Sequence, residues 1–106
     1  MDATHRVVLI TGASRGIGRA TAVMLGERGA AVGVNYVRDL AAAEQTAAEV
    51  ERAGGRAVLL QGDVADEQAV LAMFDGLEAA FGRIDVLVNN AGIVAASLPL
   101  AQMDAA

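Results

Sequence analysis

Four short apolar segments recur along the chain about every 25 residues, separated by longer stretches with helical spacing. They cover residues 6–11, 31–36, 56–61 and 84–89. Their apolar residues are continuous rather than alternating, as is typical of strands covered on both faces of a parallel sheet. The interval fits one strand plus a crossover helix. We therefore predict an α/β fold with a doubly wound parallel sheet of about four strands and three crossover helices, forming one domain over residues 1–106.

Each intervening stretch carries the start and stop signals of a helix. Asp39 and Asp66 stand at expected N-cap positions of the second and third helices, and glycine follows the last turn of all three. Apolar residues at helical spacing should form the buried faces. In the first helix they are Ile17, Ala20, Thr21, Met24 and Leu25. In the other two they are Ala43, Ala47 and Val50, and then Val70, Phe74, Leu77 and Phe81.

The composition excludes several classes of protein. A hydrophobic fraction of 55% argues against disorder, and the absence of cysteine removes disulfides and thiolate metal sites. A net charge of −5 with scattered arginines argues against a nucleic-acid partner. No segment near the start has the length of a signal sequence or membrane span, and the single histidine, His5, lacks partners for a metal. We expect a cytoplasmic protein without metal, membrane or nucleic-acid partners.

The strongest functional motif is the sequence TGASRGIG at residues 11–18, directly after the first predicted strand. Glycines permit a tight strand-to-helix turn and let backbone N–H groups approach a pyrophosphate at the helix N-terminus. The spacing differs from the general G-x-G-x-x-G fingerprint, and a plain glycine-rich turn is the alternative. Its position between strand and helix favours the pyrophosphate site. The candidate binding residues are Gly12, Ser14, Arg15, Gly16, Ile17 and Gly18.

Two further motifs follow predicted strands. The sequence NNAG at residues 89–92 closes the fourth strand, and Asp63 and Val64 follow the third. In a doubly wound sheet the first and fourth strands are neighbours at the switch point, so residues 89–92 should border the same crevice as the glycine turn. Taken alone, Asp63 is better explained as a loop or cap aspartate.

Together, these three ordered motifs resemble the short-chain dehydrogenase/reductase family, in particular its single-domain branch that includes 3-oxoacyl-carrier-protein reductases. The resemblance covers essentially the whole chain. It implies a Rossmann-type fold in which Gly12, Gly16 and Gly18 hold a nicotinamide dinucleotide. It also implies that Thr11 hydrogen-bonds toward the loop at residues 89–92, and that the protein interconverts ketones and alcohols by hydride transfer.

The resemblance further implies how the adenosine half is held. The Asp63 carboxylate would contact the adenine amino group, and the Val64 N–H a ring nitrogen. Asn90, Ala91 and Gly92 would line the adenosine ribose and the centre of the sheet.

The choice of cofactor follows from charges near the end of the second strand. An acid there would accept a hydrogen bond from the ribose 2′-hydroxyl and repel a 2′-phosphate. This chain has Asn35 and Tyr36 at that place, with Arg15 and Arg38 able to pair with a phosphate. We therefore predict NADP(H) over NAD(H). The alternative is that both arginines are solvated surface residues, with Asp39 capping a helix and weakly offsetting Arg38.

The family's catalytic Tyr, Lys and Ser are not identifiable here. The single tyrosine, Tyr36, is followed four residues later by Leu40, and the chain has no lysine. Ser14 belongs to the glycine turn, and Ser97 precedes the place of the family's catalytic serine. We predict no catalytic residue in this chain, which would be the front half of a longer, homo-oligomeric enzyme acting on a small carbonyl or alcohol. The alternatives are a truncated reading frame or a non-catalytic dinucleotide-binding module or sensor.

Overall fold

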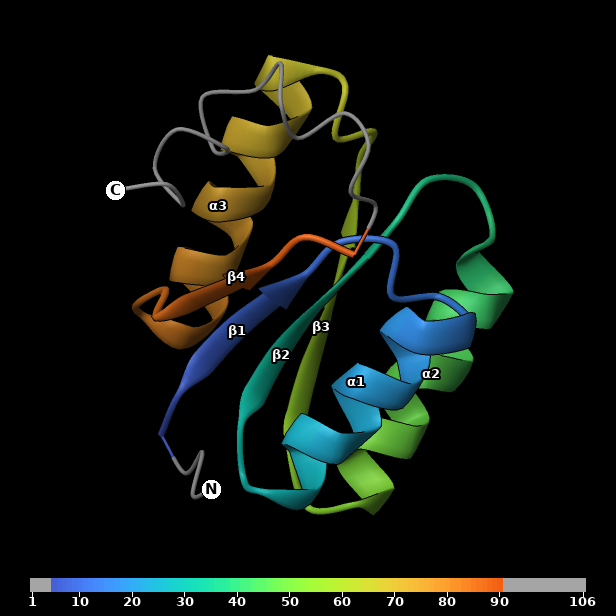
Figure 1. Ribbon diagram of the computed structural model, residues 1–106. Coiled ribbons are helices and arrows are strands. Elements are labelled where there is room, and N and C mark those ends of the chain that lie inside the picture. Colours follow the sequence, from blue (N-terminus) through green and yellow to red (C-terminus); the bar gives the residue numbers. More distant parts are fainter. Residues whose placement is uncertain (1–4, 91–106) are drawn as a thin grey trace.

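A four-stranded parallel sheet forms the centre of the computed structural model, which describes residues 5–90 (Figure 1). The strands are β1 (Val7–Ile10), β2 (Ala31–Tyr36), β3 (Arg56–Gln61) and β4 (Val86–Val88). Their order is β3-β2-β1-β4, with every pair parallel. The chain therefore reverses its direction of travel across the sheet at β1, which creates a switch point between β1 and β4. The predicted doubly wound fold is confirmed.

The three crossover helices cover both faces of the sheet. They are α1 (Gly16–Glu27), α2 (Leu40–Arg52) and α3 (Glu67–Phe81). Figure 1 shows α1 and α2 on one face and α3 on the other. The Asp39 side chain caps α2 by accepting from Ala42 N, and the Asp66 side chain caps α3. Both predicted N-caps are confirmed, and Gly82 ends α3 in the left-handed conformation.

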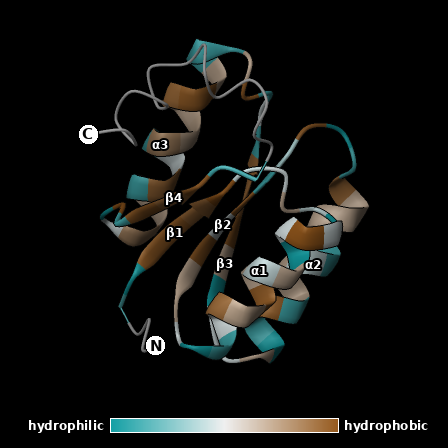
Figure 2. Cartoon of the chain, viewed as in Figure 1, coloured by the Kyte–Doolittle hydropathy of each residue, from teal (hydrophilic) through white to brown (hydrophobic). Residues whose placement is uncertain are grey.

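Two apolar clusters, one on each face of the sheet, hold the layers together. One joins β1 and β2 to α1 and α2, and the other joins β1 and β3 to α3. Every residue of β1 and β2 is buried, and Figure 2 shows hydrophobic residues along β1 and β4. Burial on both faces explains why these strands lack polar alternation.

The predicted buried face of α1 is confirmed at Leu25 and wrong at most of its other residues. Ile17 is 79% exposed and Met24 44% exposed, whereas the buried residues are Gly18, Ala22, Leu25 and Gly26. The reason is the close approach of α1 to α2, since a Cβ built on Gly26 would lie 2.9 Å from Val50 Cγ1. Small residues therefore form the close contact with α2, and Ile17 and Met24 point outward.

The strand β4 is shorter than the predicted segment 84–89 and forms an edge of the described sheet. Just before β4, Asp85 bonds to Val7 of β1 in place of regular strand pairing. The Asp85 carboxylate accepts from Val7 N over 2.8 Å, and the Asp85 N–H donates to Val7 O over 2.9 Å. Arg83 donates to the same carboxylate over 2.7 Å, and these bonds lower the pKa of Asp85. Val86 remains 43% exposed.

Among the described residues, no helix is long and apolar enough to cross a membrane.

Candidate nucleotide-binding site

The carboxyl ends of β1 and β4 lie next to the start of α1, at the carboxyl-terminal end of the sheet (Figure 1). The N–H of Thr11 donates to Val88 O over 3.1 Å, and its hydroxyl lies 3.2 Å from Asn89 Oδ1. The side-chain amide of Asn90 donates to Gly12 O over 3.1 Å. These bonds confirm that the glycine turn and the loop after β4 border one region, and that Thr11 bonds toward that loop.

Three glycines shape the turn. Gly12 and Gly16 have φ values of +62° and +61°, which favour glycine. A Cβ on Gly18 would collide with the carbonyl oxygen of Gly12 and lie 2.8 Å from Asn90 Nδ2. By contrast, a Cβ on Gly16 would meet no described atom within 4 Å. The turn is thus tightly packed beneath Gly18 and open above Gly16, where a ligand has room to approach the backbone.

The backbone N–H groups of the turn fall into two sets. Gly12 N donates to Asn35 Oδ1 over 3.0 Å, and Ala13 N donates to Asn35 O over 2.9 Å, so both are already bonded within the protein. At the start of α1, Arg15 occupies the N-cap position and makes no side-chain cap bond, unlike the aspartates that cap α2 and α3. The first-turn amides of α1 at residues 16–18 therefore remain as donors for an anion.

Asn35 and Tyr36 lie inside the fold. Asn35 is 1% exposed, and its Nδ2 donates to Leu60 O over 3.1 Å and to Gly62 O over 2.9 Å. Tyr36 is 9% exposed and belongs to the cluster under α1 and α2. The polar atoms of the Asn35 side chain join the ends of β1, β2 and β3, and cofactor contact by Asn35 and Tyr36 stays a prediction.

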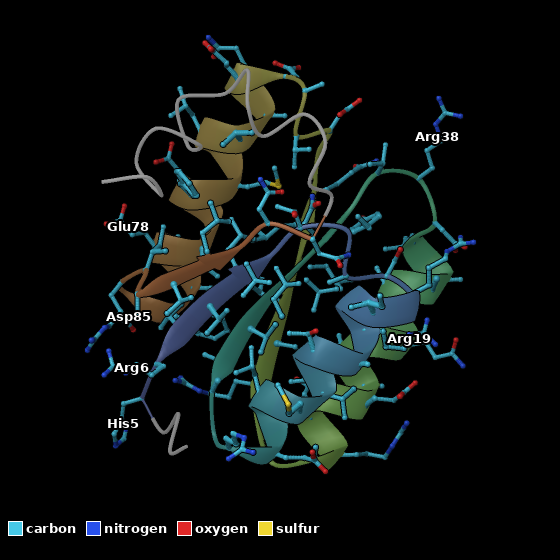
Figure 3. All side chains as sticks on the ribbon, viewed as in Figure 1. His5, Arg6, Arg19, Arg38, Glu78 and Asp85 are labelled. Atoms are coloured by element: carbon cyan, nitrogen blue, oxygen red, sulfur yellow. The ribbon has the colours of Figure 1, made fainter. Side chains whose placement is uncertain are left out.

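The charged groups after β2 are arranged differently from the prediction. Arg15 forms a 2.7 Å ion pair with Asp39, and the two side chains are 71% and 44% exposed. Arg38 extends into solvent from the loop after β2 (Figure 3). Asp39 therefore offsets Arg15 rather than Arg38, and both guanidinium groups are accessible to a phosphate.

Asp63 and Val64 follow β3 at the same carboxyl-terminal end of the sheet. Asp63 is exposed, and one of its carboxylate oxygens accepts from Ala65 N over 2.9 Å, which confirms its role as a loop aspartate. The Val64 side chain is 8% exposed and packs in the cluster beside α3. Their contacts with adenine stay a prediction, as do the roles of Ala91 and Gly92, which lie outside the described residues.

Two residues beside the turn were missed in the sequence. Arg19, on α1, donates its Nε to Thr46 Oγ1 over 2.8 Å and its Nη2 to Ser14 O over 2.6 Å and Ala42 O over 3.0 Å. Thr46, on α2, is 0% exposed. The sequence signal that could have identified Thr46 was a polar residue among the small apolar residues of the second predicted helix.

Among residues 5–90, no group of three His, Cys, Asp or Glu side chains could hold a metal ion.

Comparison with known proteins identifies the family of this chain. A family model described as short chain dehydrogenase matches residues 6–106. Cis-4-hydroxycyclohexanecarboxylate dehydrogenase of Sinomonas cyclohexanicum is 46% identical over 102 residues, covering 96% of this chain and 40% of that protein. This chain spans less than half the length of several such relatives.

Solved structures share the fold. A putative dehydrogenase from Burkholderia cenocepacia with bound NADP has a TM-score of 0.79 and 37% identity, over 83% of this chain and 34% of that one. The NADH-dependent reductase A1-R′ complexed with NAD has a TM-score of 0.76 and 32% identity, over 82% of this chain and 36% of that one. With its glycine turn, switch point and matched family model, this chain belongs to the short-chain dehydrogenase/reductase family.

Proposed function

We propose that this chain is the nucleotide-binding part of an NAD(P)-dependent oxidoreductase that interconverts a ketone and an alcohol, with NADP(H) preferred. The observation that carries the proposal is the uncapped start of α1, set beside a turn whose preceding amides are already bonded. When bound, the dinucleotide supplies or accepts the hydride. The residues of this chain bind and orient it.

The donor set fits such a cofactor. The pyrophosphate would lie over Gly16, where the backbone is open, and accept from the first-turn amides of α1 with the favourable helix dipole. The Ser14 and Ile17 side chains, half-buried and 79% exposed respectively, flank this place. Asp63 and Asn90 would contact the adenosine half from the ends of β3 and β4.

The preference for NADP(H) rests on the residues of this chain, since similar structures carry NADP in one case and NAD in another. No acid follows directly on β2, and Arg15 and Arg38 are both exposed. An exposed ion pair such as Arg15 with Asp39 contributes only about 0–1 kcal/mol. Arg15 can therefore exchange Asp39 for a 2′-phosphate, which accepts stronger charge-assisted hydrogen bonds.

A titration of the full chain with NADPH and NADH tests the proposal. We expect tighter binding of NADPH. Arg38→Ala should raise the NADPH Kd by about tenfold, the loss of one hydrogen bond to a charged group, and leave the NADH Kd unchanged. Arg52→Ala, at the far end of α2, is the matched control and should change neither Kd. Tighter binding of NADH by the unaltered chain, or an unchanged NADPH Kd in Arg38→Ala, contradicts the NADP(H) preference.

We further propose that the whole protein acts on a small carbonyl or alcohol in the cytoplasm and forms homo-oligomers. In the described residues Val86 is exposed on the β4 edge, so a further strand, from another part of the protein or from a second copy, would bury apolar surface and satisfy edge backbone groups there. The Ser, Tyr and Lys that the family uses for proton transfer are not identifiable in this chain, so that step would belong to another part of the protein.

A further inference from the structure

A polar cluster joins the glycine turn to α2, and nucleotide contacts do not account for it. It comprises the Ser14 carbonyl, the Arg19 guanidinium and the Thr46 hydroxyl. Thr46 is 0% exposed, and the Arg19 side chain is 24% exposed. Figure 3 shows Arg19 beside the two helices, away from the end of β4. We call this cluster the Ser14 clamp.

The clamp fixes the direction of one peptide unit. The Ser14 carbonyl accepts from Arg19 Nη2 over 2.6 Å and lies 3.2 Å from Thr46 Oγ1. No cis peptide bond occurs in the described residues, and a planar trans peptide directs its C=O and N–H to opposite sides. Holding the Ser14 oxygen toward α2 therefore holds the Arg15 N–H away from α2.

The Thr46 hydroxyl is placed for more than helix packing. Threonine in a helix ordinarily bonds the carbonyl four residues earlier, as Thr21 does with Ile17 O over 2.9 Å. Thr46 has the equivalent partner, Ala42 O at 3.3 Å, which would satisfy its proton. The Thr46 hydroxyl also lies 2.8 Å from Arg19 Nε and 3.2 Å from the Ser14 oxygen. These contacts go beyond the bond within α2, and they orient the guanidinium toward the turn.

We propose that Arg19 and Thr46 are positioning residues that hold the Ser14–Arg15 peptide in the orientation needed for pyrophosphate binding. This inference rests on the proposed function and deepens it. A freely rotating peptide could turn the Ser14 oxygen toward an anion at the start of α1, where its partial negative charge would repel the anion. With the clamp in place, the carbonyl is held away before the ligand arrives, so binding does not have to reorder this peptide.

The test compares Thr46→Val, which keeps the shape but removes the hydroxyl, with Thr46→Ser, which keeps the hydroxyl. Thr21→Val is the matched control, because its hydroxyl bonds only within α1 in the described structure. Arg19→Lys is the second probe, since lysine cannot reach Thr46 and both carbonyls together. Two readouts are taken on the full chain: the Arg15 amide resonance without ligand, and the Kd values of NADPH and of adenosine 2′-monophosphate, which has no pyrophosphate.

We expect Thr46→Val and Arg19→Lys to shift the Arg15 amide resonance and to raise the NADPH Kd about tenfold, the loss of about one hydrogen bond. The Kd of adenosine 2′-monophosphate should stay within about twofold, since it has no pyrophosphate to lie beside the clamped peptide and meets Arg15 only at its exposed guanidinium. Thr46→Ser should restore NADPH binding, and Thr21→Val should change nothing. Unfolding curves in urea confirm that each variant is folded under the binding conditions.

Three results overturn the inference: an unchanged Arg15 resonance in both clamp variants, an unchanged NADPH Kd in both, or equal losses for NADPH and the mononucleotide. The ligand-free resonance separates this inference from the proposed function. If the unaltered chain binds neither NADPH nor NADH, the proposed function fails and the pyrophosphate role of the clamp fails with it. If the chain binds NADPH but the clamp variants match the unaltered chain, the positioning role alone fails.

Discussion

Substitution of Asn35 gives the strictest test of how hydrogen bonds within the fold support the candidate site. Its side-chain oxygen accepts from Gly12 N, and its Nδ2 donates to Leu60 O and Gly62 O, so one amide joins the ends of β1 and β3. Nδ2 also lies 3.0 Å from Met73 Sδ on α3. Asn35→Ala removes every one of these bonds at a position that is 1% exposed.

The cost can be worked out from the burial of each partner. The bond to Leu60 O is buried, and an unsatisfied buried group costs about 1–3 kcal/mol. The bonds to Gly12 N and Gly62 O are partly buried, so water can replace the amide at a loss of about 0.5–1 kcal/mol each. The sum is about 3 kcal/mol, a large share of the roughly 5–15 kcal/mol that stabilises a typical domain. For a chain of this size it lowers Tm by roughly 10–20 °C.

Urea unfolding followed by circular dichroism measures this loss. Gln45→Ala, an exposed amide on α2, is the control and should change stability by less than about 0.5 kcal/mol. An Asn35→Ala variant that loses less than about 1 kcal/mol would refute the reasoning, because its bonds would then be no stronger than bonds to water.

A second substitution at the same position separates hydrogen bonding from packing. In Asn35→Asp the carboxylate can still accept from Gly12 N, but it faces the carbonyl oxygens of Leu60 and Gly62. Burial and these oxygens disfavour the charged form, so the folded-state pKa rises above the unfolded value of about 4. The destabilisation should therefore be small at acidic pH and grow as pH rises above about 4. Equal destabilisation at all pH values would contradict this origin.

Three further predictions follow from the fold. Gly18→Ala should abolish dinucleotide binding in calorimetry and destabilise the fold, because the new methyl group collides with the turn; binding equal to that of the unaltered chain would contradict it. Asp85→Asn should lessen the fall in stability below about pH 4, because the Asp85 carboxylate has a lowered pKa and its stabilisation, present above that range, is lost on protonation; denaturant titrations at several pH values measure this. Ile17→Ala should leave Tm nearly unchanged whereas Leu25→Ala lowers it by about 10 °C or more; similar losses in the two variants, as equal burial would give, would contradict this.

The sheet could be predicted from the sequence because its central strands are buried on both faces. Continuous apolar segments marked β2 and β3 with the observed bounds, and aspartate and glycine signals marked the helix ends. The start of β4 was predicted two residues too early, because Asp85 replaces strand pairing there with a side-chain bond to Val7. Local sequence does not reveal such a long-range partner.

The inner face of α1 could not be predicted from hydrophobicity. Glycine and alanine carry little apolar signal, yet Gly18, Ala22 and Gly26 are buried, and Gly26 makes the close contact with α2, while Ile17 is left in solvent. The functions of Asn35 and Thr46 were hidden for a related reason. Each is a buried polar residue whose partners lie on other elements, so its role depends on packing rather than on spacing along the chain.

The central claim is that the start of α1 provides amide donors for a dinucleotide pyrophosphate. An amide-resolved NMR titration of the full chain with NADPH tests it directly. We expect the largest resonance changes at Gly16, Ile17 and Gly18, with only small changes at Gly12 and Ala13, whose N–H groups are bonded to Asn35. A folded chain whose residues 16–18 keep their resonances at saturating NADPH and NADH would contradict the account.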